Sequence, residues 1–238
     1  MNQMLTAFTP AVSEEIFDLR PDYFAISVVA DGIVNVANHP LVERYVDETV
    51  TRPVRAPWAE GHLEAWRAAY RAFGAKPQRT PSSADALLMR LGKDGRLPTI
   101  NAVVDLYNAI SVRYAIPVGG ENIAAYVGPP RLVCASGAEF FETMKDGKPV
   151  AEPVPTGEVV WTDDRGVTFR RWNWRQGIRT RIDLHTCFAW FVLDRLEPMP
   201  LDAAADAGVE LKAMLRQICP AAQVSVRRID RAGTTKIS

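Results

Sequence analysis

The chain has 238 residues, of which 47% are hydrophobic, and its 28 Lys and Arg residues balance 28 Asp and Glu residues, so the formal net charge is zero. A chain of this length and composition can bury a full hydrophobic core and is expected to be globular. Its neutrality excludes an overall basic field that would draw it to long duplex DNA. It shows neither the pattern of a secretion signal nor an apolar run long enough for a membrane span, which predicts a cytoplasmic protein without a membrane partner.

The cysteines and histidines are scattered along the sequence. Cys134, Cys187 and Cys219 lie far apart and form no Cys-x-x-Cys pair, so we expect reduced thiols in the core instead of disulfides or a zinc site. The three histidines are equally dispersed and give no support to a metal site or to a Cys-His or Ser-His-Asp arrangement. We therefore expect neither a metal nor a cofactor.

Apolar patterning predicts a mixture of strands and helices. Runs of β-branched and aromatic residues predict strands at residues 22–30, 131–135, 157–162, 187–193 and 223–229. Apolar residues at helical spacing predict helices at residues 58–73, 80–92, 101–114 and 202–218. Ser82 is expected to cap the second helix in a capping box with Asp85, and Asn101 to cap the third. The first twenty residues and the end of the chain after 229 are expected to be irregular.

No repeat, low-complexity tract or linker divides the chain, so we expect one domain over residues 1–238. Strands and helices mix without strict alternation, which argues against a doubly wound parallel sheet. The sequence predicts an α+β fold of layers, with mixed or antiparallel sheets and flanking helices.

The most unusual stretch is Thr168–Arg175, which reads T-F-R-R-W-N-W-R. As a strand it would place Arg170, Trp172 and Trp174 on one face and the residues between them on the other. Gln176-Gly177 then resembles a turn, and residues 178–184 alternate again. We expect a hairpin in which 178–184 is the returning strand.

The arginines of this hairpin allow two interpretations. Any one of them is most simply stacked on a tryptophan or paired with a nearby aspartate, the candidates being Asp163, Asp164 and Asp183. The cluster as a whole favours a ligand, because guanidinium groups that bind phosphate beside aromatic rings are typical of sites for single-stranded nucleic-acid ends. We therefore predict a nucleic-acid terminus or another phosphorylated ligand.

Two further stretches carry weaker signals. Asn101, Asp105 and Asn108 share a stripe of the third predicted helix, where periodicity favours a cap and solvated side chains over the rim of a pocket. Residues 116–121 are expected to form a loop in which Gly119 and Gly120 let the backbone approach a ligand, although no Gly-Lys-Ser/Thr follows to make a P-loop.

Several of these motifs, in this order, resemble the B3/B4 domain of the phenylalanyl-tRNA synthetase β subunit, and especially the freestanding B3/B4 proteins. The motifs are Pro81-Ser-Ser83, Leu97–Asn108, Pro117-Val-Gly-Gly120, Gly157-Glu-Val-Val160, Arg170–Arg175 and Leu184-His-Thr186. The similarity covers roughly residues 58–194. Within the synthetase this domain hydrolyses tyrosine wrongly esterified to the phenylalanine tRNA, so the resemblance implies that the 3′ end of an aminoacyl-tRNA is the ligand. It implies no aminoacylation by this chain itself.

The sequence departs from the synthetase pattern where chemistry is concerned. Tyr107-Asn108 stands where the synthetase has Thr-Asn, and Gly119 stands where it has His. Tyrosine specificity is therefore not carried over by the resemblance. The amino acid, the tRNA, the oligomeric state and the need for a synthetase partner stay open.

The resemblance suggests roles for particular residues. Ester hydrolysis needs a positioned water and donors for the developing oxyanion, but no side-chain nucleophile. We expect Asn108 and Asn173 to bind the aminoacyl group or the water. The expected binding residues are Asn101 at the rim, Gly119 and Gly120 through their N–H groups, Glu121 for the α-amino group, Arg170, Arg171 and Arg175 for phosphates, and Trp172 or Trp174 for the terminal adenine.

Two other functions compete with trans-editing of mischarged tRNA. The first is a non-catalytic module that binds tRNA or nucleotides, which the loss of the Thr and His positions favours. The second is a hydrolase of a small amino-acid derivative, in which the arginines are structural. We rank editing first, binding second and small-molecule hydrolysis third.

Overall fold

In the computed structural model, the described residues 8–51 and 56–237 form two β-sheets and six α-helices. The central sheet is antiparallel, and its strands lie in the order β12 (Gly233–Lys236), β11 (Gln223–Asp230), β2 (Phe24–Asp31), β10 (Phe188–Arg195) and β3 (Val118–Asn122). Strands β2 and β10 pair along their whole length and are buried almost throughout, because β-branched, aromatic and small residues fill both of their faces. They form the centre of the molecule.

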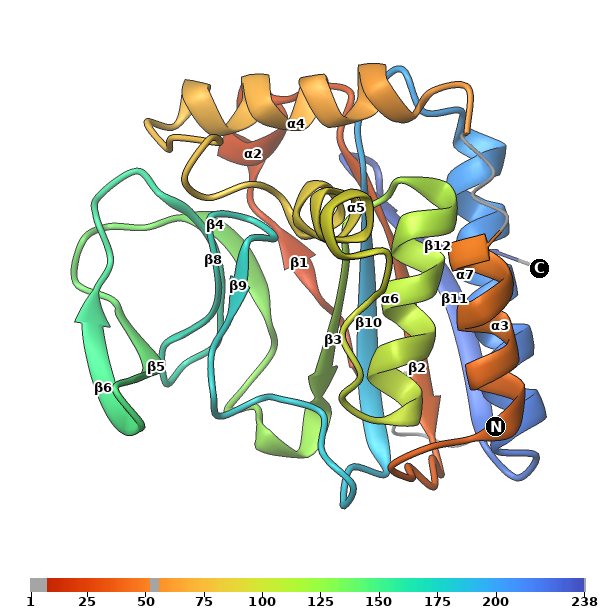
Figure 1. Ribbon diagram of the computed structural model, residues 1–238. Helices are drawn as coiled ribbons and strands as arrows, with labels where there is room; N and C mark the ends of the chain where they lie inside the picture. Colours follow the sequence, from red (N-terminus) through yellow and green to blue (C-terminus); the bar gives the residue numbers. More distant parts are fainter. Residues whose placement is uncertain (1–7, 52–55, 238) are drawn as a thin grey trace.

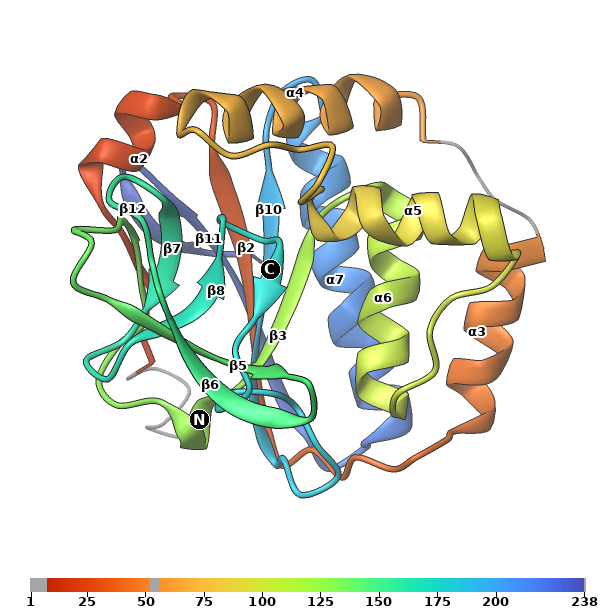
Figure 2. The ribbon, with the colours of Figure 1, turned by 60° about the vertical axis from the view of Figure 1, so that its left-hand side comes forward.

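Helices cover one face of this sheet (Figure 1). They are α3 (Pro40–Thr51), α6 (Ala102–Tyr114) and α7 (Leu201–Ile218). Helix α7 packs closely on β2, since a Cβ at Gly208 would lie 2.5 Å from Cγ2 of Ile26. Helix α5 (Ser83–Asp94) crosses the C-terminal end of α6 near the start of β3, as Figures 1 and 2 show from two sides.

The second sheet packs on the other face together with α2 (Glu14–Leu19) and α4 (Ala59–Ala72). Its strands lie in the order β1 (Ala11–Val12), β4 (Arg131–Cys134), β7 (Val159–Thr162), β8 (Val167–Arg170), β5 (Phe140–Lys145) and β6 (Lys148–Pro153), with β9 (Arg175–Gln176) paired to β8. A short 3-10 turn, Ile123–Ala125, follows β3. Tryptophans dominate the core between the layers: the rings of Trp161 and Trp190 lie 4.9 Å apart, and those of Trp66 and Trp172 lie 5.2 Å apart.

The structure confirms the α+β prediction and all four predicted helices. Ser82 caps α5 by accepting a hydrogen bond from the N–H of Asp85 (3.3 Å), and Asn101 caps α6 by accepting one from Val104 (3.1 Å). The carboxylate of Asp85 does not complete the capping box, because both of its oxygens bind Arg67 at 2.9 Å. Asn101 and Asp105, which accepts a bond from the N–H of Ile100, thus fit the structural interpretation of their stripe.

The predicted hairpin is wrong in its position. The chain turns at residues 171–174, where Arg171 (φ 48°) and Trp172 (φ 66°) adopt left-handed conformations, and β9 is only two residues long. The cause is Trp172, which is fully buried against Tyr23 and Trp66 and so cannot continue a regular strand with Trp174 on the same side. Residues 178–184 form no strand, and pair with β3 through one bridge between Arg181 and Glu121.

Other local predictions also need correction. The expected loop at 116–121 contains strand β3, the expected irregular N-terminus contains α2, and the end of the chain contains β12, which pairs with β11. Cys187 is exposed instead of lying in the core. Across the part of the chain that the structure describes, no helix is both long and apolar enough to cross a membrane. Within the same residues, no group of His, Cys, Asp or Glu could hold a metal ion.

Candidate functional site

The segment after the turn, residues 175–182, runs along the free edge of β3, and we call it the edge segment. Gln176 donates from Nε2 to the carbonyl oxygen of Gly120 (2.7 Å). The N–H of Asn122 donates to the carbonyl oxygen of Thr180 (2.8 Å). Asn101 donates from Nδ2 to the carbonyl oxygen of Ile182 (3.3 Å), which ties the segment to the start of α6. The edge segment, α5, α6 and β3 contact one another in this region, which we call the α6 corner.

One face of α6 lines this corner. Asn101, Val104, Asn108 and Ser111 share that face, because they recur at helical spacing. Its first residue bonds the edge segment at Ile182, and its last, Ser111, donates from Oγ to the carbonyl oxygen of Ile116 (2.6 Å), just before β3. Asn108 lies between these two fixed points and therefore faces the corner.

Asn108 and its neighbour Tyr107 carry polar groups that the protein leaves unused. Each residue is only 8% exposed, yet within the described residues neither the Asn108 amide nor the Tyr107 hydroxyl has a hydrogen-bond partner. Burial, with a smaller effect of the Glu121 carboxylate, raises the pKa of Tyr107, so its hydroxyl stays protonated. Neither group is among the fully buried side-chain atoms without a partner, so the polar atoms of both residues reach solvent. The amide and the hydroxyl are therefore available to bind a polar ligand.

The sequence singled out Asn108 but missed Tyr107, which periodicity assigned to the core. That assignment is half correct, because the Tyr107 ring packs on Phe191 with centroids 6.0 Å apart. Only its hydroxyl is left for a ligand. The substitution at this position, compared with the family pattern, was the one available signal.

The two glycines of β3 permit close packing on both faces of the strand. A Cβ at Gly119 would lie 2.7 Å from Cζ of Phe169, and one at Gly120 would lie 2.7 Å from Cε1 of Tyr107. Side chains therefore occupy the space that was expected to hold a ligand against this backbone. Gly120 still helps to build the corner, because its lack of a side chain fixes where the Tyr107 ring lies.

Glu121 is fully buried on the opposite face of β3 and is held by three hydroxyl groups. Tyr126, Thr168 (3.1 Å) and Thr180 all donate to its carboxylate. Burial raises the pKa of Glu121 to about 8, and the threonine donors oppose this shift. With its oxygens committed and shielded, Glu121 is not available to the α-amino group of a ligand, and the expected role is corrected.

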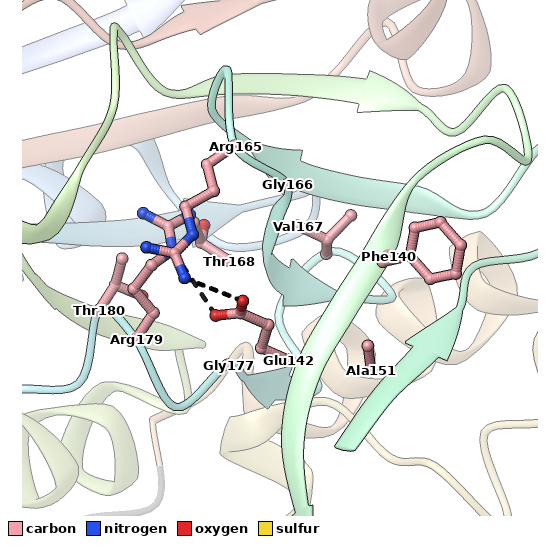
Figure 3. Close-up of a pocket in the computed structure, with 10 residues that line it drawn as sticks. All are labelled: Phe140, Glu142, Ala151, Arg165, Gly166, Val167, Thr168, Gly177, Arg179 and Thr180. Carbon is pink, nitrogen blue, oxygen red and sulfur yellow. Dashed lines mark hydrogen bonds and ion pairs between the residues drawn. The ribbon is translucent and has the colours of Figure 1, made fainter. Parts of the chain in front are cut away.

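A small pocket of about 70 Å³ lies beyond Thr168 and Thr180, between the edge segment and strands β5, β6 and β8. Figure 3 shows Arg165 and Arg179 near Glu142. Arg165 bonds Glu142 (3.1 Å), and Arg179 binds both oxygens of Asp163 at 2.8 Å and lies 4.0 Å from Glu142. The pocket is small, and its arginines are paired with acids.

Asn173 joins the 171–174 turn to the core. The Tyr70 hydroxyl donates to its Oδ1 (2.8 Å), and its Nδ2 donates to Asp194 (3.0 Å), which also accepts from the Tyr23 hydroxyl (2.7 Å). Burial raises the pKa of Asp194 to about 7 against the effect of these donors. Both ends of the Asn173 amide are used inside the protein, so its expected contact with substrate is corrected to a structural role.

The basic residues of the turn divide into two groups. Arg170 is buried and binds Glu158 through two bonds (2.7 and 2.8 Å) and Glu152 at 3.3 Å, so it is not free for phosphate. Trp172 has no exposed face on which adenine could stack. Three partly exposed residues remain for a ligand, and they form a stack in which Arg171 and Arg175 lie 4.3 and 5.8 Å from the centre of the Trp174 ring.

These features define a class of protein: an α+β domain with an antiparallel sheet between a helical layer and a mixed sheet, and a polar corner at the sheet edge. The sequence profile of the B3/4 domain matches residues 65–209, more than half of the chain. The protein therefore belongs to the B3/4 domain family.

Comparison with solved structures agrees with this assignment. The crystal structure of an N-terminal fragment of the phenylalanyl-tRNA synthetase β subunit from Pyrococcus horikoshii superposes with a TM-score of 0.50 at 10% identity, covering 98% of this chain. Our chain spans 55% of the length of that fragment, and at this identity the likeness concerns the fold alone. A comparison with curated proteins finds no match.

Proposed function

We propose that this protein binds the aminoacylated 3′ end of a tRNA and hydrolyses the ester bond in the α6 corner. Membership of the B3/4 family supports an association with tRNA, and the resemblance to the synthetase domain that edits mischarged tRNA supports the reaction. The observation that carries the proposal is the pair of unpartnered groups, the Asn108 amide and the Tyr107 hydroxyl, at 8% exposure each. They are the groups in the corner that a bound ester can satisfy.

The chemistry requires little from the protein beyond orientation. Asn108 donates from Nδ2 to the ester carbonyl oxygen, where negative charge develops as water attacks the carbonyl carbon. Tyr107, kept protonated by burial, donates a second hydrogen bond to the same oxygen or holds the attacking water. The bond between the carbonyl carbon and the ribose oxygen then breaks, and the proton from water passes to that ribose oxygen. The products are the free amino acid and uncharged tRNA.

A panel of correctly and wrongly charged tRNAs tests the proposal. The purified protein is expected to deacylate one mischarged species, and both Asn108→Ala and Tyr107→Phe are expected to slow this reaction about 10²–10³-fold, the usual effect of losing one oxyanion donor. Gln217→Ala, on the exposed side of α7, is the matched amide control and should react as wild type. Turnover that survives in both corner variants would show that the reaction occurs elsewhere.

A non-catalytic tRNA-binding module is the second candidate. The feature that favours it is that the acids near the corner are already engaged: Glu121 and Asp194 are enclosed by their own donors, and Asp105, on the stripe of Asn108, accepts from the N–H of Ile100. Aminoacyl-tRNA that binds the wild type and not Asn108→Ala, with no hydrolysis of any species, would favour this function over editing.

A further inference from the structure

We infer that the groove beside the 171–174 turn binds the phosphodiester backbone of the single strand that leads to the tRNA 3′ end. The inference rests on the proposed function and deepens it by assigning Lys76 and Arg79 as phosphate ligands. The groove has a volume of about 270 Å³ and lies between the end of α4 and the loop before β7. We call it the basic groove; the residues that carry the argument are Phe73, Lys76, Arg79, Pro155 and Arg171.

Lys76 and Arg79 form one rim of the groove, and the backbone fixes them there. The carbonyl oxygen of Lys76 accepts hydrogen bonds from the N–H of Arg79 (2.9 Å) and from the N–H of Thr80 (3.0 Å), which closes a tight turn. Both basic side chains are exposed, and neither has an ion pair with any described residue. Most other arginines near the turn have acidic partners, so these two cations differ in being left for an external anion.

Arg171 supplies the third cation, from the opposite wall. Glu158 also lines the groove, but its carboxylate is occupied by the two short bonds from Arg170, and its contact with Arg171 is longer, at 3.5 Å. The positive charge of the groove is therefore not cancelled. The pocket of Figure 3 is the contrast, because the two arginines there are paired with Glu142 and, in the case of Arg179, also with Asp163.

An aromatic contact lies next to these cations. The Arg171 guanidinium stacks on Trp174 at 4.3 Å, and both residues are partly exposed. Phe73 and Pro155 add apolar surface inside the groove. Cations that follow a backbone, together with planar groups on which bases stack, are the combination that binds single-stranded nucleic acid without reading its sequence.

The groove and the α6 corner belong to one continuous piece of chain. The N–H of Ser83, at the start of α5, donates to the carbonyl oxygen of Asn173 (3.1 Å), so the turn is tied to a helix that packs on α6. From the turn the chain passes directly into the edge segment that closes the corner. A strand held by its phosphates in the groove is thereby led toward Asn108.

The test measures binding of a fluorescein-labelled single-stranded RNA of about ten nucleotides ending in CCA, a length suited to such grooves. We compare the wild type with the double variant Lys76→Ala/Arg79→Ala over a series of salt concentrations. Removal of two phosphate contacts is expected to weaken binding at low salt tenfold or more, and to reduce the slope of log K against log salt by about 1.4, since each contact on a single strand contributes roughly 0.7. The control Lys145→Ala/Lys148→Ala removes two exposed lysines of the β5–β6 hairpin and should match the wild type.

The outcomes separate this inference from the proposed function. If the wild type and the Lys76/Arg79 variant bind RNA with equal affinity and equal salt dependence, the basic groove is not the RNA-binding site. Absence of RNA binding by the wild type at low salt would refute the inference as well. Deacylation that depends on Asn108 would uphold the proposed function in either case. Conversely, RNA binding that depends on Lys76 and Arg79, without deacylation of any charged tRNA, would support RNA binding in the basic groove and refute the proposed hydrolysis.

Discussion

Two asparagines that the sequence marked as catalytic have opposite environments, and replacing each by alanine separates function from stability. Asn173→Ala removes two buried hydrogen bonds and leaves the Tyr70 hydroxyl and the Asp194 carboxylate without this partner. At about 1–3 kcal/mol for each of the two groups, the loss of unfolding free energy is about 2–6 kcal/mol. In a chain of this length that corresponds to a fall in Tm of roughly 4–24 °C.

Asn108→Ala breaks no hydrogen bond with any described residue. We expect its unfolding free energy to stay within about 1 kcal/mol of wild type, because the Asn108 amide reaches solvent and its removal leaves no buried partner without a hydrogen bond. The same variant should lose deacylation. A protein that gives up stability to keep an unpaired group for a ligand shows this combination of an intact fold and a lost activity.

Thermal unfolding followed by circular dichroism, with deacylation measured well below either Tm, checks both variants together. If Asn108→Ala has a Tm as low as that of Asn173→Ala, Asn108 contributes to the stability of the fold and is not reserved for a ligand. If Asn173→Ala keeps the wild-type Tm, the buried hydrogen bonds from Tyr70 through Asn173 to Asp194 do not stabilise the fold.

Two further predictions concern buried charge and close packing. The pKa of Asp194 is raised to about 7 by burial, whereas in the unfolded chain it is near 3.9, so the unfolded state releases its proton first and stability should decline as pH rises from about 4 to 7. Denaturant titrations across this pH range should show a smaller decline of unfolding free energy in Asp194→Asn than in the wild type. The same decline in both proteins would contradict the raised pKa of Asp194. Gly120→Ala should destabilise by about 1–3 kcal/mol, because its Cβ would meet Tyr107 and Phe191 at 2.7 and 3.1 Å. Gly92→Ala, where a Cβ meets nothing within 4 Å in a helix, should instead stabilise by up to about 1 kcal/mol, and equal Tm changes in the two variants would refute the packing argument.

The sequence predicts those parts of the fold whose causes are local. The helices and two of their caps follow from apolar spacing and from Ser82 and Asn101, and all of these are observed. Strand β3 was missed because its Val-Gly-Gly-Glu-Asn sequence has little intrinsic strand preference. It becomes a strand through pairing with β10, about seventy residues further along the chain, which no local pattern encodes.

The candidate site residues come from two kinds of signal. Asn108 was proposed through the resemblance, and Arg171, Trp174 and Arg175 through their composition, and all four stay predictions. The role of Asn173 was reversed because its partners lie 103 and 21 residues away in sequence, at Tyr70 and Asp194. Periodicity also treated Trp172 and Trp174 as equivalent, and only the three-dimensional core shows that one is interior and the other lies at the rim.

The edge segment is attached to β3 in an unusual way. A regular strand would be joined by a ladder of backbone bonds, but here one bridge, one backbone bond and the side chains of Gln176 and Thr180 join the segment to β3. On its other side the segment pairs with β8 through Arg175 and Gln176, and the N–H of Ile178 donates to Glu142 of β5, while β3 is anchored to β10. The segment therefore bridges the two sheets, and the α6 corner lies where side chains and single backbone bonds join them in place of a continuous ladder.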